Sequence, residues 1–355
     1  MARSCLAIFL LLCLLSSLFL FSCSEQVPEN SSSPEQNGTL EPEQDAADVI
    51  EEEDDNPEED EPRVPPEEEN PASDFTWQTG EDNTVTITKY VGTDTTVVVP
   101  AQISGKDVVE IGHAAFAITE IESIFLPDSI ITIGPLAFQY CRKLEKVDMS
   151  NFVISIKGKA FGDCPLLEEI SLPKSLEFLG DRTFENCTAL KSIHLPRNLK
   201  LGGETFVYSG LESVTFEAGF SGFSKNDFGA TKIKQIVLPR GCKKIDYNSL
   251  CIGESLEEIV LNDDLEEIGS LAFTGNSNLK KIVIPSSVKR MGSEPFSGCT
   301  SLEEVLFEGD APNLTDKREE LFYVDLDALN YVVYHHKEAK GFTSPEWNEH
   351  QTKIW

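Results

Sequence analysis

The chain has 355 residues, with 61 acidic and 29 basic side chains, and its formal net charge at pH 7 is −32. Hydrophobic residues make up 40% of it, which is enough for a sizeable core and excludes a chain that is disordered throughout. So acidic a surface repels phosphate backbones and heparin-like polyanions, which excludes nucleic acid as the main partner.

The N-terminal segment, residues 1–22, is typical of a secretory signal peptide. Its one charged residue is Arg3, and apolar runs follow from Leu6 to Leu15 and from Leu18 to Phe21. The end of this segment resembles a bacterial lipoprotein signal, with small Ser22 directly before Cys23. That resemblance implies cleavage and acylation at Cys23, and several acyl chains would hold the protein on a membrane. An uncleaved membrane-spanning anchor is the alternative; both interpretations export the rest of the chain.

Residues 23–75 are predicted to be a disordered acidic tether. From residue 24 to 75 there are 20 acidic residues, eight prolines and one basic residue, Arg63. A segment of this composition cannot bury enough apolar surface to offset the loss of chain entropy on folding.

A repeat of 22–23 residues organises the rest of the chain. Its marker is a phenylalanine, with Leu250 filling the slot once: Phe116, Phe138, Phe161, Phe184, Phe206, Phe228, Phe273 and Phe296. An Ile-Gly pair or a variant stands four or five residues before each marker, and a short strand-like run ending near Leu-Pro follows about ten residues after it. Nine copies are visible. Units this small cannot bury their own apolar faces, so they are predicted to stack into a β-rich solenoid with a parallel concave sheet and a buried aromatic spine.

The repeat resembles the Treponema-type leucine-rich repeat of BspA-like bacterial surface proteins. Ile133-Gly134, Ala137-Phe138, Cys141 and Leu144 show the pattern most fully. The resemblance implies a leucine-rich-repeat solenoid over residues 111–308, an N-terminal β cap over residues 76–110 and a closing segment over residues 309–355. Three repeats lack the Ile-Gly pair, with Lys157, Asp246 and Phe223-Ser224 in its place, which leaves the local curvature open.

The cysteines are predicted to be mainly structural. Cys141, Cys164, Cys187 and Cys299 each follow the repeat phenylalanine by three residues, a phase at which leucine-rich repeats take an inward Asn or Cys. A stack of small buried thiols is the expected arrangement. A disulfide between Cys242 and Cys251 is conceivable in an oxidising compartment. No C-x-x-C pair is present, so a zinc site has little support.

No motif in the sequence indicates an enzyme or a cofactor site. His335 and His336 would point to opposite faces of a strand, which prevents shared metal ligation. Only a catalytic cluster of these two with His350 could revive an enzymatic interpretation. Paired carboxylates precede several strands, and nothing around them favours a raised pKa, so a solvated acidic band is expected rather than an acid–base pair. They are Glu168-Glu169, Glu257-Glu258 and Glu303-Glu304.

The candidate binding surface is the outward column of the predicted sheet. Each strand has one outward residue between two inward ones, and the column has a mixed and polar beginning and an apolar end. Its members are Phe125, Asp148, Ser171, His194, Thr215, Val237, Val260, Val283 and Leu306. An exposed apolar strip rimmed by Gln235, Glu258, Lys281 and Glu304 is typical of a partner-binding surface. The alternative is that β-branched residues simply stack well on a sheet.

These features together predict a lipid-anchored bacterial surface protein that binds other proteins without turnover. The resemblance implies an adhesin, with a host matrix protein or a neighbouring bacterial surface as the partner. A periplasm-facing structural protein is the alternative. Binding of a surface glycan is a third possibility, although the predicted column lacks the exposed Trp or Tyr that it would require.

Overall fold

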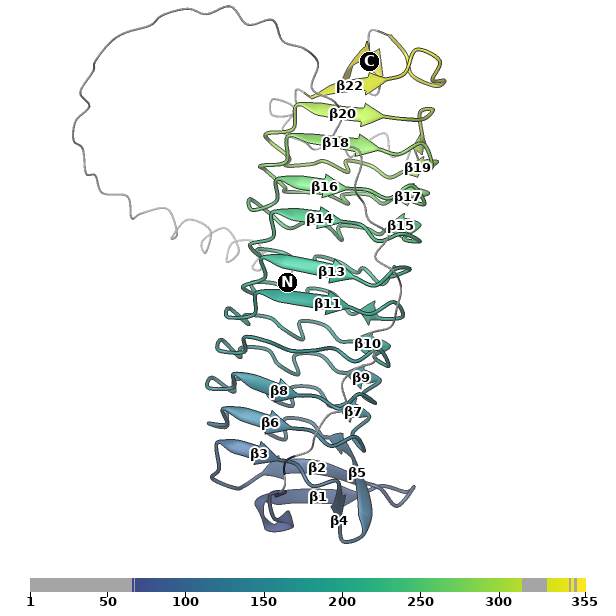
Figure 1. The fold of residues 1–355 in the computed structure, drawn as a ribbon. Coiled ribbons are helices and arrows are strands. Elements are labelled where there is room, and N and C mark those ends of the chain that lie inside the picture. Colours follow the sequence, from purple (N-terminus) through teal and green to yellow (C-terminus); the bar gives the residue numbers. More distant parts are fainter. Residues whose placement is uncertain (1–65, 67, 315–330, 345, 348–349) are drawn as a thin grey trace, which may run out of the picture. The chain divides into compact units, whose positions relative to one another are not determined.

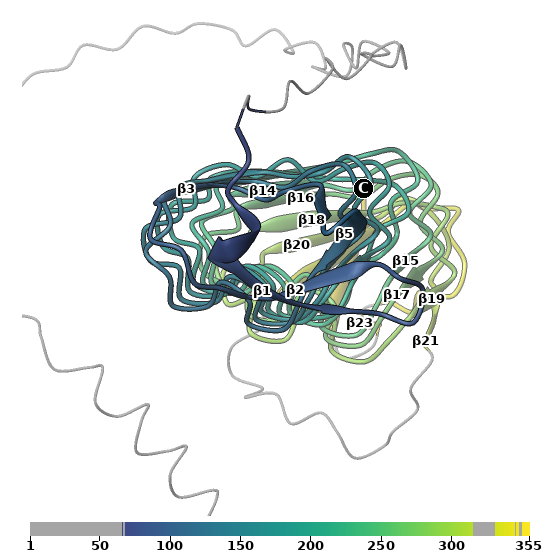
Figure 2. The same cartoon turned by 90° about the horizontal axis from the view of Figure 1, so that it is seen from below.

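The computed structural model describes residues 66, 68–314, 331–344, 346–347 and 350–355. These residues form a parallel β-solenoid, as predicted, in which each repeat makes one turn and most turns carry two short strands (Figure 1). The two strands of a turn contribute to two separate ladders that lie on different sides of the stack (Figure 2). One 3₁₀ turn, Ala72–Asp74, is the only helical element in this part of the chain.

The first ladder contains the strands that follow each repeat phenylalanine. They form four parallel sheets along one side of the stack, with breaks in pairing between β8 and β11, between β13 and β14 and between β16 and β18. Residues in each strand alternate between the core and the surface because the side-chain period of a strand is two. The ladder runs through β3 (Thr96–Val98), β6 (Ser123–Phe125), β8 (Lys146–Asp148), β11 (Ser192–Leu195), β13 (Ser213–Phe216), β14 (Gln235–Val237), β16 (Glu258–Val260), β18 (Lys281–Ile284) and β20 (Glu304–Phe307).

The second ladder contains the two-residue strands that end at the Ile of the Ile-Gly pair. Glycine follows because the turns approach closely there: a Cβ on Gly180 would lie 2.3 Å from the backbone nitrogen of Gly158. The strands are β7 (Thr132–Ile133), β9 (Ser155–Ile156), β10 (Phe178–Leu179), β12 (Lys200–Leu201), β15 (Lys244–Ile245), β17 (Glu267–Ile268), β19 (Arg290–Met291) and β21 (Asn313–Leu314).

Antiparallel pairs close both ends of the stack. At the N-terminal end, β1 pairs with β2 and β4 with β5, and β5 then begins the second ladder. Beyond β20, the first ladder continues in parallel through β22 and β24, and β23 is antiparallel to β24. These strands are β1 (Phe75–Thr79), β2 (Val85–Tyr90), β4 (Gln102–Ile103), β5 (Lys106–Ile111), β22 (Val332–His335), β23 (Glu346–Trp347) and β24 (His350–Ile354).

The N-terminal cap begins earlier than the sequence predicted. Asn70 pairs with Val98 through two hydrogen bonds, with its backbone nitrogen donating to the Val98 carbonyl and its Oδ1 accepting from the Val98 nitrogen, at 2.9 and 2.8 Å. Phe75 is 2% exposed and its ring lies 5.6 Å from that of Tyr90. Asn70 and Phe75 are therefore buried against the cap, on the N-terminal side of the boundary predicted at residue 75.

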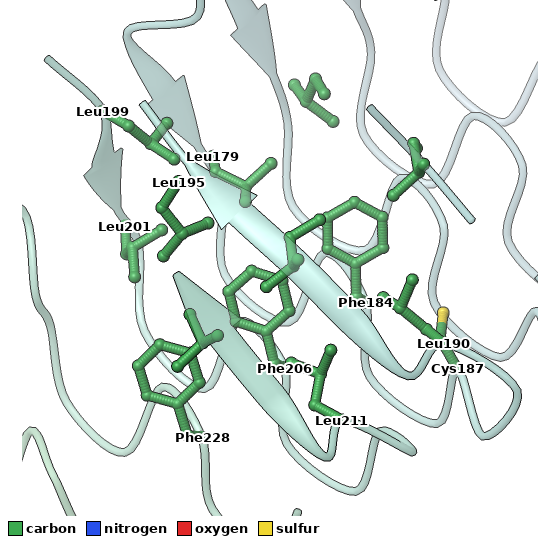
Figure 3. Close-up of a cluster of buried hydrophobic side chains, with 14 of the residues drawn as sticks. Leu179, Phe184, Cys187, Leu190, Leu195, Leu199, Leu201, Phe206, Leu211 and Phe228 are labelled. Carbon is green, nitrogen blue, oxygen red and sulfur yellow. The ribbon is translucent and has the colours of Figure 1, made fainter. Parts of the chain in front are cut away.

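The repeat phenylalanines form the buried spine that their spacing predicted. Neighbouring rings stack at 5.1–5.5 Å from Phe116 to Phe228, and Figure 3 shows three of them with Cys187, Leu190 and Leu211 packed alongside. Each fully buried ring contributes roughly 1.5–3 kcal/mol. Tyr90 and Tyr331, which the repeat spacing does not assign to the spine, extend it at its two ends.

The backbone on both sides of each spine ring is left-handed. Around Phe138, for example, Leu136 and Tyr140 both have φ of 61°. This conformation is unfavourable for residues other than glycine. It recurs because it lets the Phe138 and Tyr140 nitrogens donate to carbonyls of the next turn, at 2.7 and 3.0 Å.

Both ladders are interrupted together at one point of the described chain, between residues 216 and 235. The second ladder passes from β12 to β15 without a strand in the intervening turn, and β13 and β14 of the first ladder belong to different sheets. An aromatic cluster occupies this joint: the Phe223 ring is edge-on to Phe216 and Phe220, at 5.4 and 4.9 Å. Side-chain packing there replaces part of the missing backbone pairing.

Candidate functional site

The apolar strip predicted on the first ladder is exposed over three adjacent strands. Val237, Val260 and Val283 are 52%, 40% and 36% exposed, and they project from β14, β16 and β18. Val237 and Val260 are directly opposite each other in the parallel register. Their inward neighbours Ile236 and Ile259 are buried in the core, so the rigid stack fixes the direction in which the three valines point.

The N-terminal half of the predicted column is polar and less regular. Phe125 and Asp148 are in register but only half-buried. His194 and Thr215 are exposed, and His194 Nδ1 lies 3.0 Å from Thr215 Oγ1. Ser171 is exposed but lies in no strand, because its repeat contributes only an isolated bridge at Glu169 to this ladder.

The C-terminal end of the column differs from the prediction. Leu306 is 6% exposed rather than a surface residue. It lies opposite Tyr334 of β22, whose large side chain adjoins it and was not assigned to the column from the sequence. Tyr334 is half-buried, with the Lys353 ammonium 5.9 Å from its ring centre. The alternation of buried Val333 with Tyr334 is the sequence signal that could have identified it.

Charged residues border the strip in rows that alternate in sign. Lys234 lies 3.1 Å from Glu257, the Gln235 amide donates to Glu258 at 2.6 Å, and Lys281 lies 3.7 Å from Glu304. These side chains are substantially exposed, so each pair contributes little to folding. The rows, from the N-terminal side, are Lys234-Gln235, Glu257-Glu258, Lys280-Lys281 and Glu303-Glu304.

A shallow hollow of about 960 Å³ covers the middle of this surface. Val260, Val283 and Pro285 are among the residues that line it. Glu257, Glu258, Lys280 and Lys281 of the two central rows also line it. The hollow therefore combines apolar side chains with charges of both signs.

The cysteines of the described region are all unpaired thiols. Cys141, Cys164, Cys187 and Cys299 form the expected buried column, and the thiol of Cys187 donates to the Phe161 carbonyl at 3.2 Å. Burial raises the pKa of Cys187 to about 12, so this thiol is unreactive at neutral pH. Cys242 and Cys251, whose pairing the sequence left open, are both free thiols: Cys242 is buried with its thiol directed at the Lys244 carbonyl, and Cys251 is half-exposed.

The histidines of the closing segment stack on different aromatic rings. His335 lies 4.6 Å from the ring of Phe342, and His336 lies 4.5 Å from that of Trp355. The side chain of His350 is outside the part of the chain that the structure describes. Within that part, no group of three or more His, Cys, Asp or Glu side chains is placed to hold a metal ion.

The predicted lipidation residue Cys23 and the signal segment 1–22 also lie outside the described residues. In the described ranges, from residue 66 onward with their gaps, no helix has the length and apolar character needed to cross a membrane.

The repeat is matched by a known family model, and the chain is also similar to several solved bacterial proteins. The family model described as the BspA type leucine rich repeat region matches residues 109–232 and 221–337, with six copies. A Treponema pallidum leucine-rich-repeat protein is 27% identical over 60% of this chain and 91% of its own, with a TM-score of 0.44. A leucine-rich-repeat protein from Bacteroides capillosus is 30% identical over 41% of this chain and 95% of its own, with a TM-score of 0.30. A leucine-rich cell surface protein from Faecalibacterium prausnitzii is 20% identical over 66% of this chain and 86% of its own, with a TM-score of 0.32. No curated protein matches the chain.

Proposed function

Because the chain belongs to the BspA-type leucine-rich-repeat family, we propose that it is an exported protein-recognition module anchored to a bacterial membrane through an acylated Cys23. Its solenoid would bind another protein through the apolar strip on the first ladder. The partner would be a host extracellular-matrix protein or a protein on a neighbouring bacterial surface, which makes the protein an adhesin.

The observation that carries this proposal is the exposure of Val237, Val260 and Val283 on adjacent strands. These three aliphatic side chains keep their apolar surface exposed to water unless a partner covers it. Burying that surface would be favourable by about 25 cal/mol per Å². The scaffold beneath them is already ordered, so little conformational entropy would be lost on binding.

The double variant Val260→Lys/Val283→Lys tests the proposal. It places two charges in the middle of the strip without touching the core, so we expect the solenoid to fold while its affinity falls at least tenfold. The measurement is binding of the purified protein to matrix laid down by cultured cells and to intact bacterial cells.

A matched control is available directly before β7 and β9 of the second ladder. Ile131 and Ile154 are 41% and 43% exposed, so Ile131→Lys/Ile154→Lys introduces the same charges at similarly exposed sites and should leave binding unchanged. Unaltered affinity in a folded Val260→Lys/Val283→Lys protein would contradict the assignment of the strip.

Tyr334 gives a specific reason to retain the glycan alternative, because an exposed aromatic face is what sugar rings stack against. Its ring is half-buried and already adjoins Lys353. Protein recognition through the three valines therefore has the stronger support.

A further inference from the structure

The alternating charged rows beside the strip have an order that suits a second copy of the same surface. We propose that the partner of this face includes a second copy of this chain, bound face to face and antiparallel about a two-fold axis. The inference rests on the proposed function of the strip and specifies one of its ligands.

The two-fold axis would run along the strand direction, between β16 and β18. Rotation about this axis brings the apolar column of one copy onto the apolar column of the other, because it keeps each column on the same side of the interface. It also reverses the order of the strands, as an isologous interface requires. Val260 then faces Val283 of the second copy, and these two pairs of exposed valines form the apolar centre of the interface. Val237 lies opposite Leu306, which is 6% exposed and adds little contact area.

The same rotation matches every charged row with one of opposite sign. The rows, in order, are basic, acidic, basic and acidic: Lys234-Gln235, Glu257-Glu258, Lys280-Lys281 and Glu303-Glu304. Reversed, the order is acidic, basic, acidic and basic. Glu258 therefore faces Lys281 of the second copy, and the outer rows face each other. A two-fold axis along the stack would keep the order of the strands but would place the charged rows of the two copies on opposite sides of the apolar columns, where they could not pair.

Pairing within one chain explains the alternation of charge but not the exposed apolar strip beside it. The second ladder shows the difference. Its rows, Lys243-Lys244, Glu266-Glu267 and Lys289-Arg290, also form ion pairs between neighbouring turns, including Lys243 with Glu266 at 3.0 Å. Because the second ladder has three such rows, reversing their order about the central acidic row places the two basic rows opposite each other. The residues that follow its strands there are Asp246, Gly269 and Gly292, which provide no apolar strip.

The dimensions of the face indicate a weak dimer. Four strands spaced about 4.8 Å apart, with about five positions of 3.3 Å each, cover roughly 19 by 17 Å. This is less than the ~800 Å² that each partner buries in a standard interface. Two sheets packed about 10 Å apart would bring the valines together, and the Lys and Glu side chains lining the hollow are long enough to fill the space around the axis. We expect a dissociation constant in the micromolar range or weaker.

A charge-exchange experiment tests the proposal. One variant is Lys280→Glu/Lys281→Glu and the other is Glu257→Lys/Glu258→Lys. In each variant alone, the central rows of two copies carry the same charge, so self-association should weaken at least tenfold relative to the original chain. In an equimolar mixture, every row again faces one of opposite sign, and association should return to within about threefold of the original.

The measurement is sedimentation velocity of the full chain in detergent micelles over a range of concentrations, with thermal unfolding to establish that each variant is folded. Glu266→Lys/Glu267→Lys on the second ladder is the matched control and should self-associate like the original chain. If a double variant does not fold, the single exchanges Lys281→Glu and Glu258→Lys provide the same test.

Three outcomes would overturn the self-association proposal: an original chain that stays monomeric, variants that associate alone as strongly as the original, or a mixture that stays monomeric. A monomeric original chain whose matrix binding is still lost in Val260→Lys/Val283→Lys would overturn self-association while supporting the proposed function. A dimer disrupted by charge exchange, together with matrix and cell binding unaffected by the valine substitutions, would support self-association and overturn the adhesin role of the strip.

Discussion

Asp227 is a carboxylic acid in the core of the solenoid, directly before a spine phenylalanine, where most repeats carry Ala or Thr. Its Oδ1 accepts a hydrogen bond from Thr205 at 3.0 Å, and its Oδ2 accepts one from the Ser224 nitrogen at 2.5 Å. Burial, with a smaller contribution from the charge of Asp181, raises the pKa of Asp227 to about 7, although the hydrogen bonds from Ser224 and Thr205 act in the opposite direction. Asp227 thus connects two neighbouring turns at the joint, where both ladders are interrupted.

The raised pKa predicts that the solenoid loses stability as the pH rises. Since the pKa of Asp227 is higher in the folded chain than the ordinary value of 3.8, the folded state binds a proton more tightly than the unfolded state. The stabilisation is complete below about pH 4 and is lost as the pH rises through about 7. Asp227→Asn removes this titration, so above pH 7 the variant should melt about 5 °C higher than the original chain.

Thermal unfolding followed by circular dichroism from pH 4 to pH 9 measures this difference. Asp263→Asn provides a control for the loss of one acidic side chain, because Asp263 is exposed whereas Asp227 is buried. A constant melting difference between Asp227→Asn and the original chain across that range would show that Asp227 does not titrate as inferred.

The joint is the weakest connection between elements in the described part of the chain. Elsewhere at least one ladder continues between successive turns, but between β12 and β15 and between β13 and β14 both are interrupted. Cross-turn hydrogen bonds persist at the spine corner, where the Phe206 nitrogen donates to the Asp227 carbonyl at 2.8 Å. Local opening should therefore begin here, because protection from exchange follows the local density of backbone hydrogen bonds.

We expect amide hydrogens of residues 217–227 to exchange at least tenfold faster than those of residues 258–268, measured by hydrogen exchange with mass spectrometry. The second segment contains β16 and the start of the following turn, where the second ladder is continuous, so it is the appropriate reference. Equal protection of the two segments would mean that the aromatic cluster at the joint fully compensates for the missing strands.

At the scale of the whole molecule, the location of the solenoid decides between an adhesin and a periplasmic scaffold. If the chain is displayed outside the cell, protease added to intact bacteria should degrade residues 76–355 while a periplasmic control protein survives. The readout is immunoblotting with an antibody against this region. Protection that lasts until the outer membrane is opened would instead support the periplasmic scaffold.

The spine could be predicted from sequence because its phenylalanines report a core contact that every turn repeats. Exposure on the strip could not be predicted with the same accuracy, since it depends on neighbours outside the repeat: Tyr334 adjoins Leu306, and Ser171 lies where its strand does not form. Phe75 was assigned to the tether because the surrounding composition is acidic, although its burial is determined by Tyr90 across the cap. The charge rows were visible in the sequence, but their order acquires meaning only when the strands are in register.

The direction of the ladder hydrogen bonds also determines how the molecule would respond to mechanical load. In parallel ladders such as β18 and β20, these bonds run along the stack from one turn to the next. Tension applied to the two ends would therefore enter each turn at the corner where the chain leaves it, and would peel the turns apart one by one rather than shear whole strands. Each turn of 22–23 residues would release roughly 75 Å of chain. A tethered solenoid would thus lengthen in steps under flow, with its remaining turns still folded.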